Sequence, residues 1–189
     1  KSDFFLEREG FKLTYTPFMA DAVVKALQDF PEMNSSISGT SVTYHKNINI
    51  GLAVAIENGL MVPVMYNCEE KNFLGLCRAV NDIAHRTRTK NISAEELQGS
   101  TFSITNFGVF GVTMGTPIIN QPNVGILGIG AIKKQPVVVE SPQGDGITIR
   151  SMMMISLGFD HRLIDGAGAA KFIEKVRHYL ETMNSGTIL

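Results

Sequence analysis

Apolar and polar residues follow two different spacings along this chain, and the spacings separate helices from strands. Apolar side chains three and four positions apart predict helices over residues 16–27, 72–88 and 167–182. Alternating or continuous apolar runs predict strands at 48–56, 60–66, 101–106, 124–132, 135–140 and 147–158, with a shorter one around 42–44. The helices and strands are mixed without an internal repeat or a strict β-α-β order, which predicts an α+β fold.

Individual residues indicate where these elements begin and how they pack. Thr16 and Pro17 predict a helix start with a capping hydroxyl and a proline in the first turn. Pro63 restricts its strand to a sheet edge or a bulge, because proline lacks the backbone N–H of a central strand. The three glycines within residues 124–132 predict a bulge or the close approach of another backbone segment.

Composition and charge narrow the class of protein. The 189 residues are 44% hydrophobic and 19% charged, so we expect one domain over residues 1–189 with a substantial core. The formal net charge of −1 comes without long basic runs, which argues against a nucleic-acid partner. No apolar run reaches the roughly 18 residues of a membrane span, so we expect no membrane partner.

Cys68 and Cys77 are the only cysteines in the chain. They lack the paired Cys-x-x-Cys spacing or the clustered histidines of a structural zinc site. We therefore expect two reduced, intracellular thiols and no metal.

One short motif, residues 159–166, could carry chemistry. It places His161 at the end of a strand and Asp165 four residues later, immediately before Gly166. A histidine with an ordinary pKa near 6.5 can take and return a proton at neutral pH, as acyl transfer to a thiol requires. The alternative is that His161 is a turn residue and that Asp165 only caps the following helix. The motif alone leaves both readings open.

Three motifs in order, at residues 101–108, 116–122 and 159–166, closely resemble the catalytic domain of dihydrolipoamide acyltransferases, the core components of 2-oxo acid dehydrogenase complexes. The resemblance extends to residues 16–18 and 51–55, and so through nearly the whole chain. It implies a chloramphenicol acetyltransferase-like fold, in which a mixed β-sheet sandwich is flanked by helices. It also implies transfer of an acyl group between dihydrolipoamide and coenzyme A.

The resemblance also implies roles for individual residues. His161 matches the family's general base and Asp165 the aspartate of its motif. Thr105 matches a hydroxyl residue that faces the reaction centre from a neighbouring subunit, where its alternative is a β-favouring strand residue. Asn106 is expected to contact the pantetheine of coenzyme A or to serve as a turn residue. Coenzyme A is then a co-substrate, and the lipoyl group sits on a separate domain.

The same resemblance implies partners and a compartment. We expect homotrimers that assemble into a hollow cubic or dodecahedral core, together with the lipoyl domain and the 2-oxo acid dehydrogenase and dihydrolipoamide dehydrogenase components. The compartment would be the cytoplasm of a bacterium or the mitochondrial matrix of a eukaryote. Residues 109–111 and 116–120 look closer to succinyl-transferring members, and acetyl and branched-chain acyl groups remain open.

Two departures from the family pattern bear on this interpretation. The family domain usually has an N-terminal segment before the point that matches Lys1, so residues 1–189 are expected to be a catalytic domain lacking that segment. Asp160 precedes His161 where chloramphenicol acetyltransferases commonly have a second histidine. The alternatives are a chloramphenicol-type acetyltransferase and, in a different class, a non-catalytic scaffold of the complex.

Overall fold

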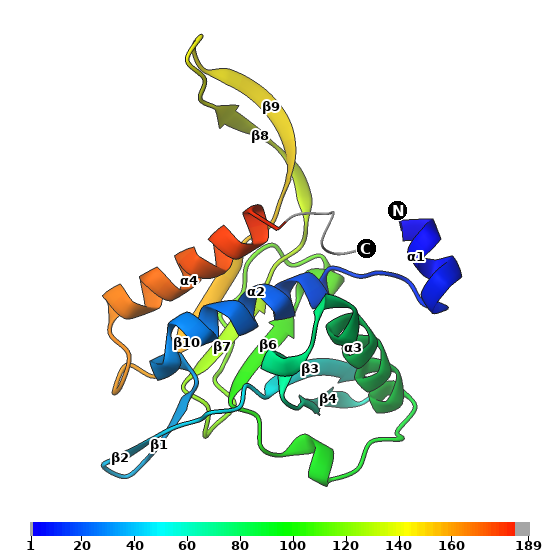
Figure 1. Cartoon of the computed structure of the whole chain (residues 1–189), viewed down its shortest axis with the longest axis vertical. Helices are drawn as coiled ribbons and strands as arrows, with labels where there is room; N and C mark the ends of the chain where they lie inside the picture. Colours follow the sequence, from blue (N-terminus) through cyan, green and yellow to red (C-terminus); the bar gives the residue numbers. More distant parts are fainter. Residues whose placement is uncertain (1, 184–189) are drawn as a thin grey trace.

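A mixed sheet of six strands forms the centre of the molecule, which a computed structural model describes over residues 2–183 (Figure 1). Across the sheet the order is β10 (Ile155–Phe159), β7 (Gly125–Ile129), β6 (Phe102–Asn106), β3 (Ile50–Ile56) and β4 (Gly59–Met61), with β5 (Val64–Met65) also paired to β3. The three central strands β3, β6 and β7 run parallel, whereas β10, β4 and β5 are antiparallel to their neighbours. The α+β prediction is confirmed.

Three long helices cover one face of this sheet: α2 (Thr16–Asp29), α3 (Phe73–Arg88) and α4 (Gly166–Glu181) (Figure 1). Their apolar sides meet alternate strand residues, including Leu52, Ile104 and Leu127, in one buried cluster. This burial is the main source of stability because apolar side chains removed from water contribute roughly 1.5–3 kcal/mol each. The shorter α1 (Ser2–Glu9) lies beyond this layer, and short 3-10 turns span Pro31–Met33, Cys68–Glu70, Glu95–Leu97 and Gly108–Phe110.

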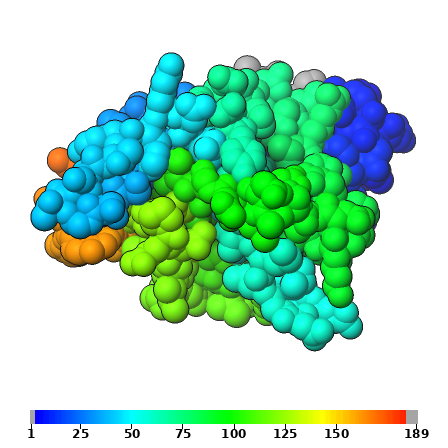
Figure 2. All heavy atoms as spheres, turned by 90° about the horizontal axis from the view of Figure 1, so that it is seen from below, coloured from blue at the N-terminus to red at the C-terminus, as the bar shows by residue number. Residues whose placement is uncertain are grey.

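The opposite face of the sheet carries small residues because chain segments lie directly on it. A Cβ added to Gly158 would be 2.8 Å from the backbone oxygen of Pro117, and one added to Gly128 would be 2.6 Å from the Phe107 ring. The close backbone approach predicted from the glycines within residues 124–132 is confirmed at Gly130, where an added Cβ would collide with the backbone oxygen of Thr113. The segment responsible, residues 107–120, follows β6 and is green to yellow-green where it reaches the surface seen from below (Figure 2).

Two hairpins extend away from the central sheet. One joins β1 (Ser35–Ser38) to β2 (Ser41–Tyr44), and the other joins β8 (Lys133–Val139) to β9 (Gly146–Met152) as a long arm (Figure 1). The prediction of one strand over 147–158 is wrong. The chain leaves its extended pairing at residues 153–154, so that β9 pairs with β8 while β10 pairs with β7.

Two predicted details at element ends have opposite outcomes. Pro63 separates β4 from β5, as expected for a residue confined to an edge or bulge, and its carbonyl accepts a hydrogen bond from the Leu52 N–H at 2.9 Å. The predicted capping hydroxyl of Thr16 is wrong. The cap residue of α2 is Tyr15, which makes no side-chain capping bond, and the helix start depends on Pro17 and on burial instead.

Candidate functional site

Thr105 and Asn106 lie at the carboxyl end of β6, between two strands that fix their position. Thr105 is paired with Ala53 of β3 on one side and with Gly128 of β7 on the other. Because side chains alternate along a strand, Thr105 is on the face opposite Ile104, which is buried under the helices. Its hydroxyl makes no hydrogen bond within residues 2–183. It is therefore available as a donor to a ligand.

The loop after β6 is held tightly against β7 and β10, and this keeps the end of β6 in place. A Cβ on Gly108 would lie 2.5 Å from the carbonyl carbon and oxygen of Gly130, so only glycine fits there. The Ser156 hydroxyl donates a hydrogen bond of 2.6 Å to the backbone oxygen of Gly115. Ser156 was not identified from the sequence, since a serine in a strand carries no signal of such a contact.

His161 lies in the turn that follows β10, and its ring is exposed to solvent. The Phe159 ring lies next to it, with centroids 5.5 Å apart and planes at 37°. Asp160 anchors the start of this turn because its N–H donates to the Val124 carbonyl at 2.9 Å. Its carboxylate pairs with Arg162 at 2.6 Å, and the hydrogen bonds from Arg162 lower the pKa of Asp160. The residue before His161 is thus an ionised anchor engaged with Arg162.

Asp165 is the N-cap residue of α4. Its carboxylate oxygen Oδ1 accepts a hydrogen bond of 2.6 Å from the Gly168 N–H, which satisfies a donor that the first helical turn leaves free. The neighbouring Ile164 is buried, and its N–H donates to the Asp160 carbonyl at 3.0 Å. Both ends of the turn that carries His161 are therefore fixed, one by Asp160 and the other by Asp165.

Within one chain, Thr105 and His161 are held apart. The strand register aligns Thr105 with Gly128 and Gly128 with Ser156, so Thr105 is level with Ser156 two strands away. Neighbouring strands lie about 4.8 Å apart and residues advance about 3.3 Å, which places Phe159 roughly 10 Å along and 10 Å across from Thr105. His161 follows two residues later. The two side chains cannot act on the same atom within a single copy.

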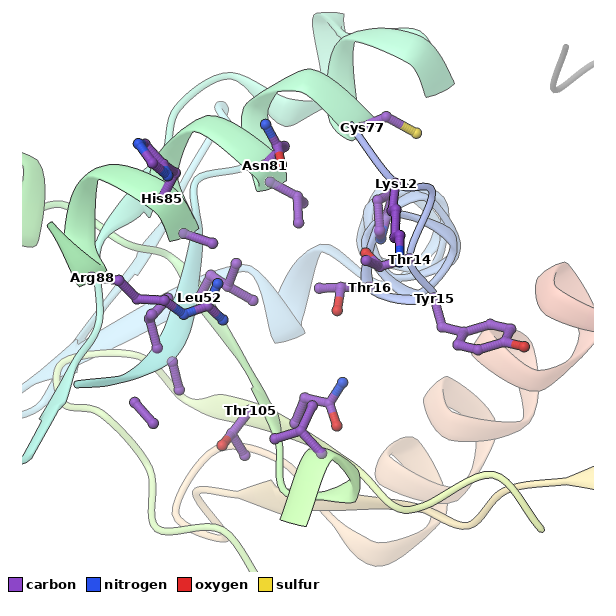
Figure 3. A pocket seen from close by; sticks show the side chains of 18 of the residues that line it. Lys12, Thr14, Tyr15, Thr16, Leu52, Cys77, Asn81, His85, Arg88 and Thr105 are labelled. Carbon is purple, nitrogen blue, oxygen red and sulfur yellow. The ribbon is translucent and has the colours of Figure 1, made fainter. Parts of the chain in front are cut away.

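A cavity of about 440 Å³ borders the end of β6 (Figure 3). Its walls are one side of α3, the segment 11–17 that leads into the first turn of α2, parts of β3 and β4, and residues from 105 to 110. Thr105 and Asn106 are among its lining residues, whereas His161 and Asp165 are not. The structure thus brings two of the four predicted site residues together and places the other two at the opposite end of the sheet.

The lining also includes residues that sequence reasoning did not single out, notably Lys12, Asn81 and Arg88. Helical spacing predicted that one side of α3 is apolar, but it could not show that the end of that helix borders a cavity. Among residues 2–183, no group of three His, Cys, Asp or Glu side chains is arranged to hold a metal ion. In the same range, no helix is both long enough and apolar enough to cross a membrane.

Comparison with solved structures identifies the same fold elsewhere. A probable dihydrolipoamide acetyltransferase from Listeria monocytogenes 4b F2365 superimposes with a TM-score of 0.92 at 36% identity, covering 97% of this chain and 77% of that one. The cubic core of a pyruvate dehydrogenase multienzyme complex gives a TM-score of 0.88 at 34% identity, covering 96% and 74%. A chloramphenicol acetyltransferase is similar in fold alone, with a TM-score of 0.56 at 16% identity over 95% and 82%. The expected chloramphenicol acetyltransferase-like fold is confirmed.

Sequence comparison gives the family directly. The acetyltransferase component of the acetoin cleaving system of Bacillus subtilis (strain 168) is 46% identical over 93% of this chain. This chain covers 43% of that protein, so it spans less than half of the relative's length. A family model described as 2-oxoacid dehydrogenases acyltransferase (catalytic domain) matches residues 2–188. The chain therefore belongs to the 2-oxoacid dehydrogenase acyltransferase family.

Proposed function

We propose that this chain transfers an acyl group between dihydrolipoamide and coenzyme A, at a site formed by His161 of one copy and Thr105 of the next. The observation that carries the proposal is the sheet register, which keeps these two residues at opposite ends of one copy. A second copy can supply the missing half, because in a cyclic assembly each subunit presents different surfaces to its two neighbours.

The chemistry follows from the two side chains. The His161 imidazole takes the thiol proton, and the thiolate attacks the carbonyl carbon of the acyl thioester, forming a new C–S bond. The oxyanion of the tetrahedral intermediate accepts a hydrogen bond from the Thr105 hydroxyl. When the intermediate collapses, the original C–S bond breaks and the departing thiolate recovers the proton from the imidazolium. A carboxylate is ordinarily too weak a base to deprotonate a thiol. Asp165 instead caps α4 and so holds the turn that positions His161.

A related structure supports these assignments. It concerns the roles of a serine, a histidine and an asparagine in the catalytic mechanism of the Azotobacter vinelandii dihydrolipoamide acetyltransferase, 34% identical over 96% of this chain. The histidine and asparagine of that protein are four positions apart, as are His161 and Asp165 here. This chain thus has a carboxylate, rather than an amide, at that spacing.

Exposed apolar side chains in the segment that follows Thr105 along the chain support contact with a second copy. Val109 is 71% exposed, Phe110 69%, Met114 64% and Ile118 91%. All four side chains belong to the ten-residue segment 109–118, and exposed apolar surface is typical of protein interfaces. We propose that homotrimers form through such contacts and build a larger hollow core, which receives the lipoyl domain and the dehydrogenase components. Its compartment would be the bacterial cytoplasm or the mitochondrial matrix.

Relatives of this chain are named for different acyl groups. Bacillus subtilis relatives with 38% identity are named for a branched-chain α-keto acid dehydrogenase complex and for succinyl transfer, and the relative with 46% identity for acetyl transfer. Succinyl, expected from residues 109–111 and 116–120, is therefore one of several acyl groups for which relatives are named.

A steady-state assay tests the function. The purified chain is given acetyl-, succinyl- and branched-chain acyl-coenzyme A with dihydrolipoamide, and separately with chloramphenicol. Thiol-dependent transfer is expected, and transfer to the antibiotic alone would contradict the proposal. A correctly assembled protein without any transfer would instead indicate a scaffold. Comparing Asn106→Ala with the wild type in the same assay tests the expected pantetheine contact through the KM for coenzyme A.

A further inference from the structure

The arginines of α3 differ in whether an acidic side chain pairs with them, and none of them has a role in the proposed acyl transfer. Arg78 pairs with Glu9 at 2.8 Å, and Arg86 pairs with Asp82 at 2.9 Å and with Glu96 at 2.7 Å. Arg88 has no acidic partner within residues 2–183. Its side chain instead extends from the end of α3 toward Leu52, at the cavity (Figure 3).

A second cation lies on another wall of the same cavity. Lys12 belongs to the segment before α2, and it too has no acidic partner among the described residues. His85 lies on α3 nearly one turn before Arg88 and also lines the cavity. None of the lining residues in the described chain is an aspartate or a glutamate. Cations that line one concave site repel each other, and an anion bound between them relieves that repulsion.

The rest of the lining fits a ligand with several oxygen atoms. Thr14, Thr16, Asn81 and Asn106 supply hydroxyl and amide groups that can donate hydrogen bonds. A volume of about 440 Å³ lies in the range of small-molecule sites. Arginine is also the residue best suited to bind phosphate or carboxylate oxygens through two parallel hydrogen bonds.

We propose that this cavity binds the anionic part of a substrate, with Arg88 and Lys12 as its charge partners. The inference rests on the proposed acyl transfer, because that reaction brings an anionic thioester to the end of β6. Two sources share the required chemistry: the phosphates of coenzyme A, and the terminal carboxylate of a dicarboxylic acyl group. Arg88 and Lys12 then decide which acyl donors bind well.

Binding measurements on the assembled protein test this assignment. Arg88→Gln and Lys12→Gln are compared with Arg78→Gln, which removes the same charge from the same helix outside the cavity. Calorimetry gives Kd for coenzyme A, uncharged pantetheine, acetyl-pantetheine and succinyl-pantetheine. Circular dichroism and the mass of the assembly verify that each variant is folded. Losing one charge-assisted contact is expected to weaken binding of the anionic probe about tenfold or more.

The probes separate the two sources. Weaker coenzyme A binding with unchanged pantetheine binding identifies the phosphates, and selective loss of succinyl-pantetheine identifies the acyl carboxylate. Either result supports the inference, provided that Arg78→Gln behaves as the wild type. Kd values within twofold of the wild type for every probe in both variants would overturn it. Acyl transfer by the wild type is assayed in parallel, so an inactive wild type would count against the proposed function alone.

Discussion

Thr105 and His161 lie at opposite ends of the central sheet, because β10 runs antiparallel to β7 whereas β6 runs parallel to it. Thr105 is near the end of β6, and His161 follows the end of β10. The strand directions therefore make any site that uses both residues a site between copies. The contributions of His161 and Thr105 can each be tested in single variants before the two variants are mixed.

Replacing His161 tests the proposed base. His161→Ala is expected to lower kcat about 10²–10⁴-fold, since it removes the group that takes the thiol proton. Stability should change little because the ring is exposed and makes no hydrogen bond within residues 2–183. Stopped-time assays with acyl-coenzyme A and dihydrolipoamide give kcat, and thermal unfolding checks the fold. His178→Ala on α4 is the matched histidine control, and equal activity of both variants would refute the role of His161.

Replacing Thr105 tests the oxyanion donor. Thr105→Val keeps a branched side chain in the strand but removes the hydroxyl, and is expected to cost about 10²–10³-fold in kcat with a smaller change in KM. Thr105→Ser retains the donor and should keep most of the activity. If the serine and valine variants lose activity equally, the hydroxyl is not the group that matters.

Replacing Asp165 tests its role as the N-cap of α4. Asp165→Ala removes the acceptor for the Gly168 N–H and is expected to lower the free energy of unfolding by about 1 kcal/mol. Asp165→Asn keeps an acceptor at the cap and should restore most of that stability. Urea unfolding of both variants measures the difference. Identical unfolding of the alanine variant and the wild type would show that the cap contributes nothing.

Gly108 tests how the loop beside the site is held. An alanine there would place its Cβ 2.5 Å from the Gly130 carbonyl, so the loop must move, at a typical cost of about 1–3 kcal/mol. Activity should fall as well, since the loop adjoins Thr105. Gly146→Ala is the control because a Cβ there meets nothing within 4 Å. Equal melting temperatures for the two variants would contradict the close packing.

Burial of the two cysteines predicts a dependence of stability on pH. Burial raises the pKa of Cys68 from 9.0 to about 11, and likewise that of Cys77 to about 11. The folded state therefore retains protons that the unfolded state loses, so this contribution to stability is complete below pH 9 and decreases as the pH rises toward 11. Urea unfolding of the wild type and of Cys68→Ala, at pH values between 9 and 11, measures how the free energy of unfolding depends on pH in each protein. A steeper loss in the alanine variant would contradict the assignment.

The helices and most central strands could be predicted from the sequence because their apolar spacing directly reflects which side is buried. The division of residues 147–158 into β9 and β10 could not, because the residues around Met153 favour strands throughout and only their partners differ. The tertiary fold determines that β9 pairs with β8 and that β10 pairs with β7.

The candidate site was predictable in part. His161, Asp165, Thr105 and Asn106 were predicted from motifs and the family resemblance, but neither the separation of Thr105 from His161 nor the contact of Ser156 with Gly115 is a property of local sequence. The order and direction of the strands determine the separation of Thr105 from His161. The contact between Ser156 and Gly115 forms because the loop after β6 folds back over the sheet. Arg88 was missed for a similar reason, since the cavity exists only once α3 lies across β3.

The most direct test of a site shared between copies is complementation. Thr105→Ala and His161→Ala proteins are purified, dissociated, mixed in equal amounts and reassembled, with mass spectrometry verifying mixed trimers. Each variant alone should be nearly inactive, whereas random mixing should restore about a quarter of the wild-type activity, because one junction in four pairs an intact His161 with an intact Thr105. Activity no higher than that of the separate variants, despite verified mixing, would contradict the shared site.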